Sequence, residues 1–355
     1  MFFGSADGAD PAVGYDLVLE VARRADRAGL ACIWTPERHF HSFGGLFPNP
    51  VVISAAVAAV TQRLQIRAGS LISPLHDPIR IAEDWAVVDR LSHGRAAISF
   101  GSGWNADDFV FFPERYAGRR DLVFEQMDVV RRLWRGEHTT RVNGVGVDVS
   151  LDLHPRPVQA SLPVWVTSSG SPETFRRAGS AGANVLTHLV NKDLDQLAEH
   201  TQAYRRARAA AGWSPNTGIV SLMLHTYLDR DPIVARDRAR APLREYLRSA
   251  VSLEQRAAAA GGTMSGGHTP GTDSFAPELV DEMVELRCER YLDGASLIGS
   301  TDTCAPLLRR IAGAGVDEVA CLLDFGPQPD EVLATVDGLA DLARDCAART
   351  SAVAR

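Results

Sequence analysis

Several polar residues of the sequence follow short apolar runs, and their types could carry chemistry. The run at residues 31–34 is followed by Glu37, His39 and His41. An imidazole titrates near neutral pH and can give or take a proton, and its ring nitrogens also bind metal ions. The His-X-His spacing therefore indicates either proton transfer or a metal site.

A metal site would need further ligands from later in the sequence. His188, His225 and Asp324 each lie at the end of a later apolar run. Metal-dependent hydrolases on α/β barrels combine a histidine pair, later histidines and a late aspartate around a metal that activates water. Here the pair follows the second apolar run instead of the first, and no lysine or clear acid follows the fourth. A metal-dependent hydrolase stays open as an alternative.

A second constellation is the turn Ser-Ser-Gly-Ser-Pro-Glu-Thr at residues 168–174, which opens a predicted helix. The first amides of a helix have no partner within it and carry partial positive charge, so they can bind a phosphate. Pro172 fits the first helical turn, and Gly170 lets the chain approach a ligand closely. The same pattern is typical of an ordinary capped helix, so both interpretations stay open at this point.

The order of the apolar and amphipathic segments predicts how these residues are positioned. Short β-branched runs alternate with longer amphipathic segments, which is typical of parallel strands joined by helices in an α/β protein. The predicted strands are residues 1–3, 31–34, 64–68, 96–100, 163–167, 184–187, 219–226 and 318–323. Strands in strict β/α order favour a closed (β/α)₈ TIM barrel over an open sheet, and active sites of such barrels lie at the carboxyl ends of the strands.

We expect a single barrel domain over residues 1–355 with two insertions. Residues 139–159 alternate polar and β-branched side chains around an Asn-Gly pair, which predicts a hairpin. Residues 257–274 are rich in Ala, Gly, Ser and Thr, which predicts a flexible Gly-rich loop or lid.

The charge and composition of the chain limit the kinds of binding partner that we expect. The net charge is -7 without a long block of like charge, so neither nucleic acid nor an anionic membrane is an expected partner. The five cysteines are scattered and form no Cys-X-X-Cys pair, which is typical of a reducing cytoplasm. The sequence shows no export signal and no apolar run long enough to span a membrane. The expected partner is a small molecule in the cytoplasm.

Together, the loops resemble the bacterial luciferase-like flavin monooxygenases. The resemblance is closest to the subgroup associated with polyketide and non-ribosomal peptide biosynthesis, and it covers most of the chain. The matching motifs lie at residues 34–40, 43–50, 78–85, 87–95, 102–109, 133–136, 186–189 and 315–326.

The resemblance implies an oxidoreductase that binds reduced FMN, lets it react with O₂ to a flavin C4a-peroxide, and inserts one oxygen atom into an organic substrate. Because no second nucleotide site is evident, a separate NAD(P)H:flavin reductase is the expected source of reduced flavin. The substrate would be free or tethered to a carrier protein, and the enzyme would be a homodimer. Within the same superfamily, an F420-dependent oxidoreductase and a non-catalytic flavin-binding relative are alternatives.

The resemblance also implies the catalytic residues. Glu37 and His39 match the family's Glu-X-His-Phe stretch, in which the histidine assists oxygen chemistry at the flavin and deprotonation of the substrate. His76 and Asp77 precede a predicted helix and are interpreted as helix caps.

Cofactor contacts follow from the resemblance in the same way. The flavin ring would lie against a bulge with a non-proline cis peptide, which Gly69 and Ser70 match. The phosphate would take Arg119 as counter-charge, with Arg120 equally placed by spacing. The implied cofactor-binding residues are Gly69, Ser70, Ser102, Asn105, Arg119, Ser168, Ser169, Gly170 and His188.

Overall fold

The computed structural model describes residues 1–2, 11–189, 193–259 and 277–353. Most of the predicted Gly-rich loop at 257–274 lies outside the described residues, and residues 257–259 form the end of a helix. The strands are β1 Cys32–Thr35, β2 Gln65–Ile72, β3 Ala96–Gly101, β4 Thr139–Val142, β5 Asp148–Leu151, β6 Val164–Ser168, β7 Asn184–His188, β8 Val220–Leu228, β9 Leu297–Gly299 and β10 Glu318–Leu322.

Helices follow the strands in the predicted order. They are α1 Pro11–Ala28, α2 Pro50–Val60, α3 Pro78–Leu91, α4 Arg119–Arg135, α5 Pro172–Ser180, α6 Leu194–Ala210, α7 Pro232–Ala259, α8 Pro277–Arg290, α9 Thr301–Gly313 and α10 Pro329–Val353. Short 3-10 helices lie at Ser73–Leu75, Ala106–Phe111 and Pro113–Arg115, and one π-helical turn lies at Tyr291–Ala295. Within the described residues, no helix has both the length and the apolar character that a membrane span requires.

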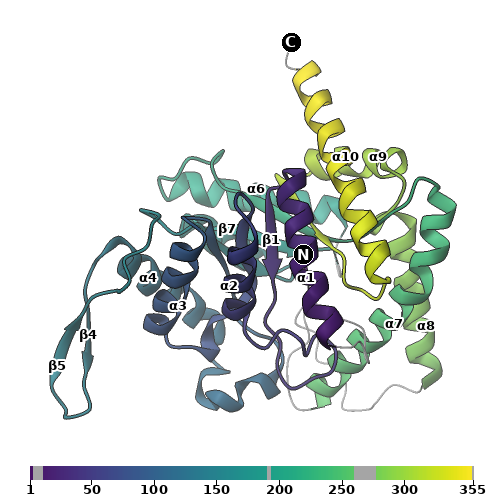
Figure 1. Cartoon of the computed structure of the whole chain (residues 1–355). Coiled ribbons are helices and arrows are strands. Elements are labelled where there is room, and N and C mark those ends of the chain that lie inside the picture. The colour runs from purple at the N-terminus through teal and green to yellow at the C-terminus, as the bar shows by residue number, and fades with distance from the viewer. Residues whose placement is uncertain (3–10, 190–192, 260–276, 354–355) are drawn as a thin grey trace.

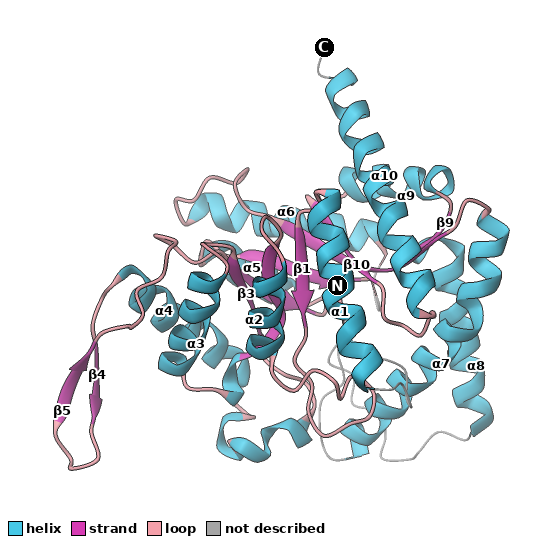
Figure 2. Ribbon diagram, in the orientation of Figure 1, coloured by secondary structure: helices cyan, strands magenta, loops and turns pink. Residues whose placement is uncertain are grey.

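The parallel sheet has the order β1-β2-β3-β6-β7-β8-β10, with β9 paired to the end of β8. Helices lie around the curled sheet (Figure 2), as expected for a barrel in which helices cover the outer face and side chains fill the interior. The predicted TIM-barrel class is confirmed. Strand β9 was not predicted, because a strand of only three residues contains no recognisable β-branched run.

The strand predicted at residues 1–3 is not formed by the described residues, Met1 and Phe2. Instead, they make individual backbone hydrogen bonds to residues in β1 and at the end of β10. Neither Met1 nor Phe2 is in a strand, and residue 3 lies outside the described part. The Phe2 amide nevertheless donates to the Trp34 carbonyl at 3.2 Å, and the Leu323 amide donates to the Met1 carbonyl at 3.2 Å. These two residues therefore bridge β1 and β10, the two edges of the curled sheet.

Strands β4 and β5 form an antiparallel pair that projects from the body of the molecule (Figure 1). Asn143 shapes their turn, because its side-chain oxygen accepts bonds from the Val145 and Val147 amides at 3.0 and 3.1 Å. The pair falls within the predicted insertion at 139–159 and lies away from the strand ends that matter for a site.

Candidate active site

A cavity of about 270 Å³ opens at the carboxyl ends of the barrel strands. One wall comes from β2, β3 and the loops after β1 and β3, and the facing wall comes from β8, α7 and α8. Of the residues implied by the resemblance, those lining the cavity are Glu37, His39, Gly69, Ser70, Ser102, Asn105, Ser169 and His188. The cavity thus collects most of the predicted site from five separate segments.

Glu37 is the centre of a hydrogen-bonded cluster on the first wall. Its carboxylate is fully buried and accepts from the Ile72 amide at 2.5 Å. The other oxygen lies 3.1 Å from His39 Nε2 and 2.6 Å from His76 Nε2. Burial raises the pKa of Glu37, whereas the two imidazoles and the Ile72 amide lower it. Together these lowering contributions exceed the effect of burial, so the pKa of Glu37 lies below its usual value. Glu37 is therefore a carboxylate that holds both histidines.

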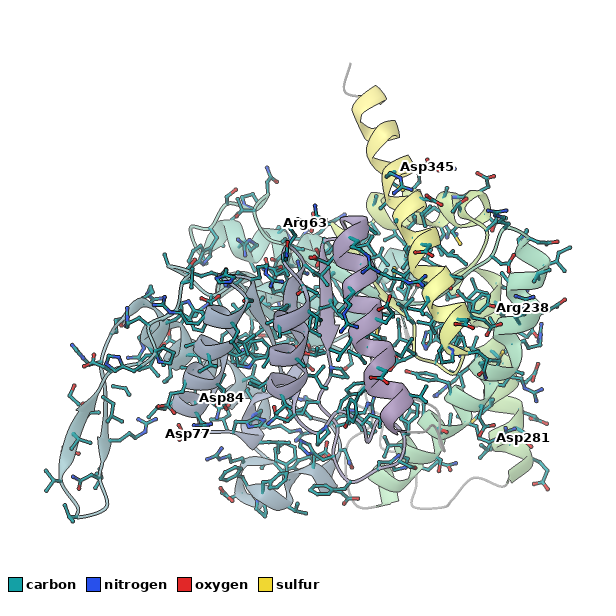
Figure 3. The ribbon with its side chains drawn as sticks, viewed as in Figure 1. Arg63, Asp77, Asp84, Arg238, Asp281 and Asp345 are labelled. Carbon is teal, nitrogen blue, oxygen red and sulfur yellow. The ribbon has the colours of Figure 1, made fainter. Side chains whose placement is uncertain are left out.

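The interpretation of His76 as a helix cap was wrong. Asp77, which is labelled in Figure 3, caps α3 instead. Its side chain accepts from the Ile79 amide at 2.8 Å. The His76 ring points to Glu37, which lies 39 positions earlier in the sequence. No local pattern in the sequence indicates this contact, because it depends on how the loops after β1 and β2 fold together.

A second carboxyl group, Asp108, lines the same cavity and was not anticipated. It follows the predicted residue Asn105, whose side-chain amide donates to it at 2.8 Å. Burial raises the pKa of Asp108 to about 6, although Asn105, His39 and Arg38 counteract the shift. Two acids of one cavity are thus shifted in opposite directions, which is the pattern of a fixed anion beside a group that can carry a proton.

Gly69 and Ser70 have the backbone that the resemblance implies. Their peptide bond is cis, and the register between β2 and β3 shifts there. A side chain at Gly69 would collide with Trp34, and one at Gly101 would lie 2.7 Å from the Ser70 hydroxyl. Packing against Trp34 and Ser70 therefore requires glycine at both positions, and these glycines give this wall of the cavity a stretch without side chains.

The residues of the small-residue turn before α5 have different positions relative to the cavity. Ser169 lines the cavity, whereas Ser168 and Gly170 are not among the lining residues. The Ser168 hydroxyl accepts from the Gly170 amide at 3.3 Å, and its carbonyl accepts from the Thr187 hydroxyl at 2.8 Å. Ser171 caps α5 by accepting from the Thr174 amide. Ser168 and Gly170 shape the turn that presents Ser169.

Arg119 begins α4 and is buried beside the cavity without lining it. Its guanidinium donates to the Gly103 carbonyl at 3.1 Å and to the Tyr116 carbonyl at 2.6 Å. The same group lies 3.9 Å from the centre of the Tyr116 ring. In this arrangement Arg119 fixes the segment that carries Ser102 and Asn105.

The residues proposed for a metal site do not form one. Across the described ranges of the chain, no three His, Cys, Asp or Glu side chains converge as metal ligands. His41 turns away from such a role, because its Nδ1 accepts from the Phe43 amide at 3.0 Å. The donor arrangement does not support the hydrolase alternative.

Comparison with known proteins identifies the family. The family model for luciferase-like monooxygenases matches residues 1–318. The chain belongs to this family. A relative from Streptomyces nodosus subsp. asukaensis, named 4-hydroxyprotoasukamycin monooxygenase, is 32% identical over 202 residues, which are 55% of this chain and 54% of that protein. Another, from Acinetobacter baylyi, is named flavin-dependent trigonelline monooxygenase, oxygenase component, and is 30% identical over 52% of each chain.

This chain spans about half the length of these curated relatives. In contrast, its fold superposes on nearly the full length of several solved structures. Monooxygenase RslO1 from Streptomyces bottropensis superposes with a TM-score of 0.71 at 23% identity, covering 96% of this chain and 98% of that one. The oxygenating constituent of 3,6-diketocamphane monooxygenase from Pseudomonas putida, solved with FMN, gives 0.74 at 18% identity, covering 94% and 93%. An F420-dependent secondary alcohol dehydrogenase gives 0.69 at 16% identity, covering 93% and 94%.

Proposed function

We propose that this member of the family is an FMNH₂- and O₂-dependent monooxygenase that oxidises an organic molecule. The observation that carries the proposal is that the Glu37, His39 and His76 cluster shares one cavity with the small-residue wall at Gly69 and with Ser169. A proton-handling group, a surface for a flat ring and a phosphate-binding turn are the three parts that such an enzyme needs.

The residues present fit FMN. Gly69, Gly101 and Gly103 leave the first wall without side chains where a ring would lie. Ser169 precedes the nine-residue helix α5, whose first amides suit a phosphate. Reduced FMN bound there would supply the electrons that activate O₂. The relative solved with FMN supports this cofactor, and the relative named an oxygenase component supports a separate NAD(P)H:flavin reductase.

His39 is the proposed proton-transfer residue, and Glu37 positions it. The Glu37 carboxylate holds the His39 ring by its Nε2 atom, which fixes the orientation of the imidazole. The His39 ring also packs against Phe111, with ring centres 5.4 Å apart, and only 10% of its side chain is exposed. A shielded imidazole of this kind can move a proton while the walls exclude bulk water.

We propose further that the substrate is an intermediate of polyketide or non-ribosomal peptide biosynthesis, free or carried on a partner protein. The motif resemblance and the relative named 4-hydroxyprotoasukamycin monooxygenase support this class. As for other barrels of this type, we propose a homodimer, and light scattering at micromolar concentration is the measurement that would show a monomer instead.

The test of the cofactor is an anaerobic titration with reduced FMN, with reduced F420 as the competing ligand. We expect FMNH₂ to bind and Ser169→Ala to weaken its binding by about ten-fold, which is the effect of losing one hydrogen bond to a charged group. Ser150→Ala in the β4–β5 pair is the matched control and should bind like the parent. Binding of F420 in place of FMNH₂ would overturn the proposal.

The test of the chemistry mixes the anaerobic complex with O₂ and follows flavin absorbance. We expect a delay before the oxidised-flavin spectrum returns, because a dry cavity with a positioned imidazole retains activated oxygen. His39→Ala should shorten this delay by at least about 100-fold, the scale of one proton-transfer group. Return of the oxidised spectrum without delay in the parent enzyme would count against an oxygenase.

A further inference from the structure

The cavity wall opposite the proposed flavin site carries aromatic side chains. His225 on β8 lies across the barrel from β2, since three strands separate them in the sheet. Its ring makes T-shaped contacts with Tyr246 of α7 and Tyr291 after α8, with ring centres 5.0 and 4.6 Å apart. Leu247, next to Tyr246 on α7, also lines the cavity. We call these four residues the His225 subsite.

His225 is the unusual member of this subsite. Only 3% of the residue is exposed, and burial lowers its pKa to about 3, so the imidazole is neutral. Its Nε2 atom is buried and has no hydrogen-bond partner in the part of the chain that the structure describes. Buried polar atoms in proteins are almost always paired, and the exceptions lie where a ligand or water completes the bond.

The rest of the subsite carries no net charge. Burial raises the pKa of Tyr246 well above its usual value and that of Tyr291 to about 12, so both phenols are neutral. At its outer edge Arg287 is paired with Glu254, with both guanidinium nitrogens 3.2 Å from one carboxylate oxygen. None of the four residues of the subsite is charged, so a charged group packed against them would lose its hydration without a counter-charge from them.

We propose that the His225 subsite binds the substrate, and that the substrate is an uncharged aromatic ring bearing a hydroxyl group that pairs with His225. The inference rests on the proposed function, because it takes the opposite wall as the flavin site. Aromatic rings pack best edge to face or offset against other rings, which the two tyrosines offer. A hydroxyl both donates and accepts, so it satisfies the imidazole in either tautomer.

The experiment measures binding of 2-naphthol and naphthalene to the full chain by equilibrium dialysis, with and without saturating FMN. The two probes share a ring system and differ in the hydroxyl. We expect wild-type protein to prefer 2-naphthol by about ten-fold, the usual effect of one buried hydrogen bond. His225→Phe should bind both probes equally, and its affinity for FMN should equal that of the wild type.

Two further variants separate the hydrogen bond from folding. His225→Gln keeps a donor and an acceptor and should retain part of the preference for 2-naphthol. His138→Phe removes an exposed imidazole that does not line the cavity and should keep the preference in full. Thermal melting of each variant confirms that it is folded.

Three results would overturn the inference. Wild-type protein could bind naphthalene as tightly as 2-naphthol, His225→Phe could keep the preference, or 1-decanol could bind as tightly as 2-naphthol. If His225→Phe weakens FMN binding instead, His225 belongs to the flavin site. Failure of FMN binding with an intact naphthol preference would reject the proposed function and leave the subsite in place.

Discussion

The two ends of the barrel interior use inward-facing side chains in opposite ways. At the amino-terminal end, Arg67 lies between Trp34 and Trp165, with its guanidinium carbon 4.8 and 4.2 Å from their ring centres, and it pairs with Glu318. The Ser221 hydroxyl donates to the same carboxylate and accepts from the Trp165 indole at 2.9 Å. The buried charge is therefore fully compensated within the protein.

The carboxyl-terminal end leaves such demands unmet. Asp108 has a raised pKa beside the Glu37 cluster, and His225 has an unpaired nitrogen among the described residues. The strands are the same, so the contrast cannot come from the fold alone. At one end the buried charge is paired within the protein, and at the other an acid with a raised pKa and an imidazole nitrogen unpartnered within the described residues lie in the cavity.

Breaking the closed end should have the largest effect on stability. Glu318→Ala leaves the buried Arg67 guanidinium without its carboxylate. We expect the free energy of unfolding to fall by about 3 kcal/mol, because an uncompensated buried charge is strongly destabilising. Urea unfolding followed by circular dichroism measures the change.

The matched control for this variant removes an acid from an exposed ion pair. Asp128 lies 3.0 Å from Arg132 on α4, and both side chains are largely exposed. Asp128→Ala should change the free energy of unfolding by no more than about 0.5 kcal/mol. Equal losses in the two variants would show that the closed end is no more demanding than the surface.

At the carboxyl-terminal end, Glu37 and Asp108 should make contributions to stability that depend on pH in opposite directions. The pKa of Glu37 is lowered from 4.5, so its contribution to stability is present above that pH and disappears as the pH falls. The pKa of Asp108 is raised from 3.8 to about 6, so its contribution is present below pH 3.8 and disappears as the pH rises through 6.

Melting temperatures of Glu37→Gln and Asp108→Asn against pH test this pair. The wild type should lose its advantage over Glu37→Gln as the pH falls below 4.5. It should lose stability relative to Asp108→Asn as the pH rises from 3.8 to 6, with no further change above. Parallel curves for both variants would mean that the two acids share one environment.

Among the variants inside the barrel, the smallest effect is expected for His225→Phe, studied without any ligand. Removing a buried nitrogen that makes no hydrogen bond should leave the free energy of unfolding unchanged within about 1 kcal/mol, or raise it. Urea unfolding provides the value. A loss much larger than this would show that the imidazole stabilises the fold itself, and would weaken the contrast between the two ends.

The sequence predicted the barrel because period and order are local signals. Runs such as that at residues 96–100 became strands within one or two residues of the predicted bounds. The three-residue strand β9 was missed, since so short a segment has no periodicity. Met1 and Phe2 take the place of the first strand with only a few bonds, which no propensity predicts.

The site was predictable only where a motif was contiguous. Glu37 and His39 are two positions apart and came from a single stretch. His76 and Asp108 join them through loop packing, so their roles appear only in three dimensions. Tyr246 lies in a long helix whose pattern gives no sign that one face borders a cavity.

The bridge at Met1 also bears on how the protein is made. The Met1 nitrogen donates to the Cys321 carbonyl at 2.7 Å, a contact between residues 320 positions apart. A ribosome delivers the first partner long before the second, so the nascent chain must carry two unpaired sheet edges until β10 emerges. Unpaired edges are templates for pairing with other chains. Strand β10 is therefore the strand whose synthesis allows the two edges of the described sheet to be bridged.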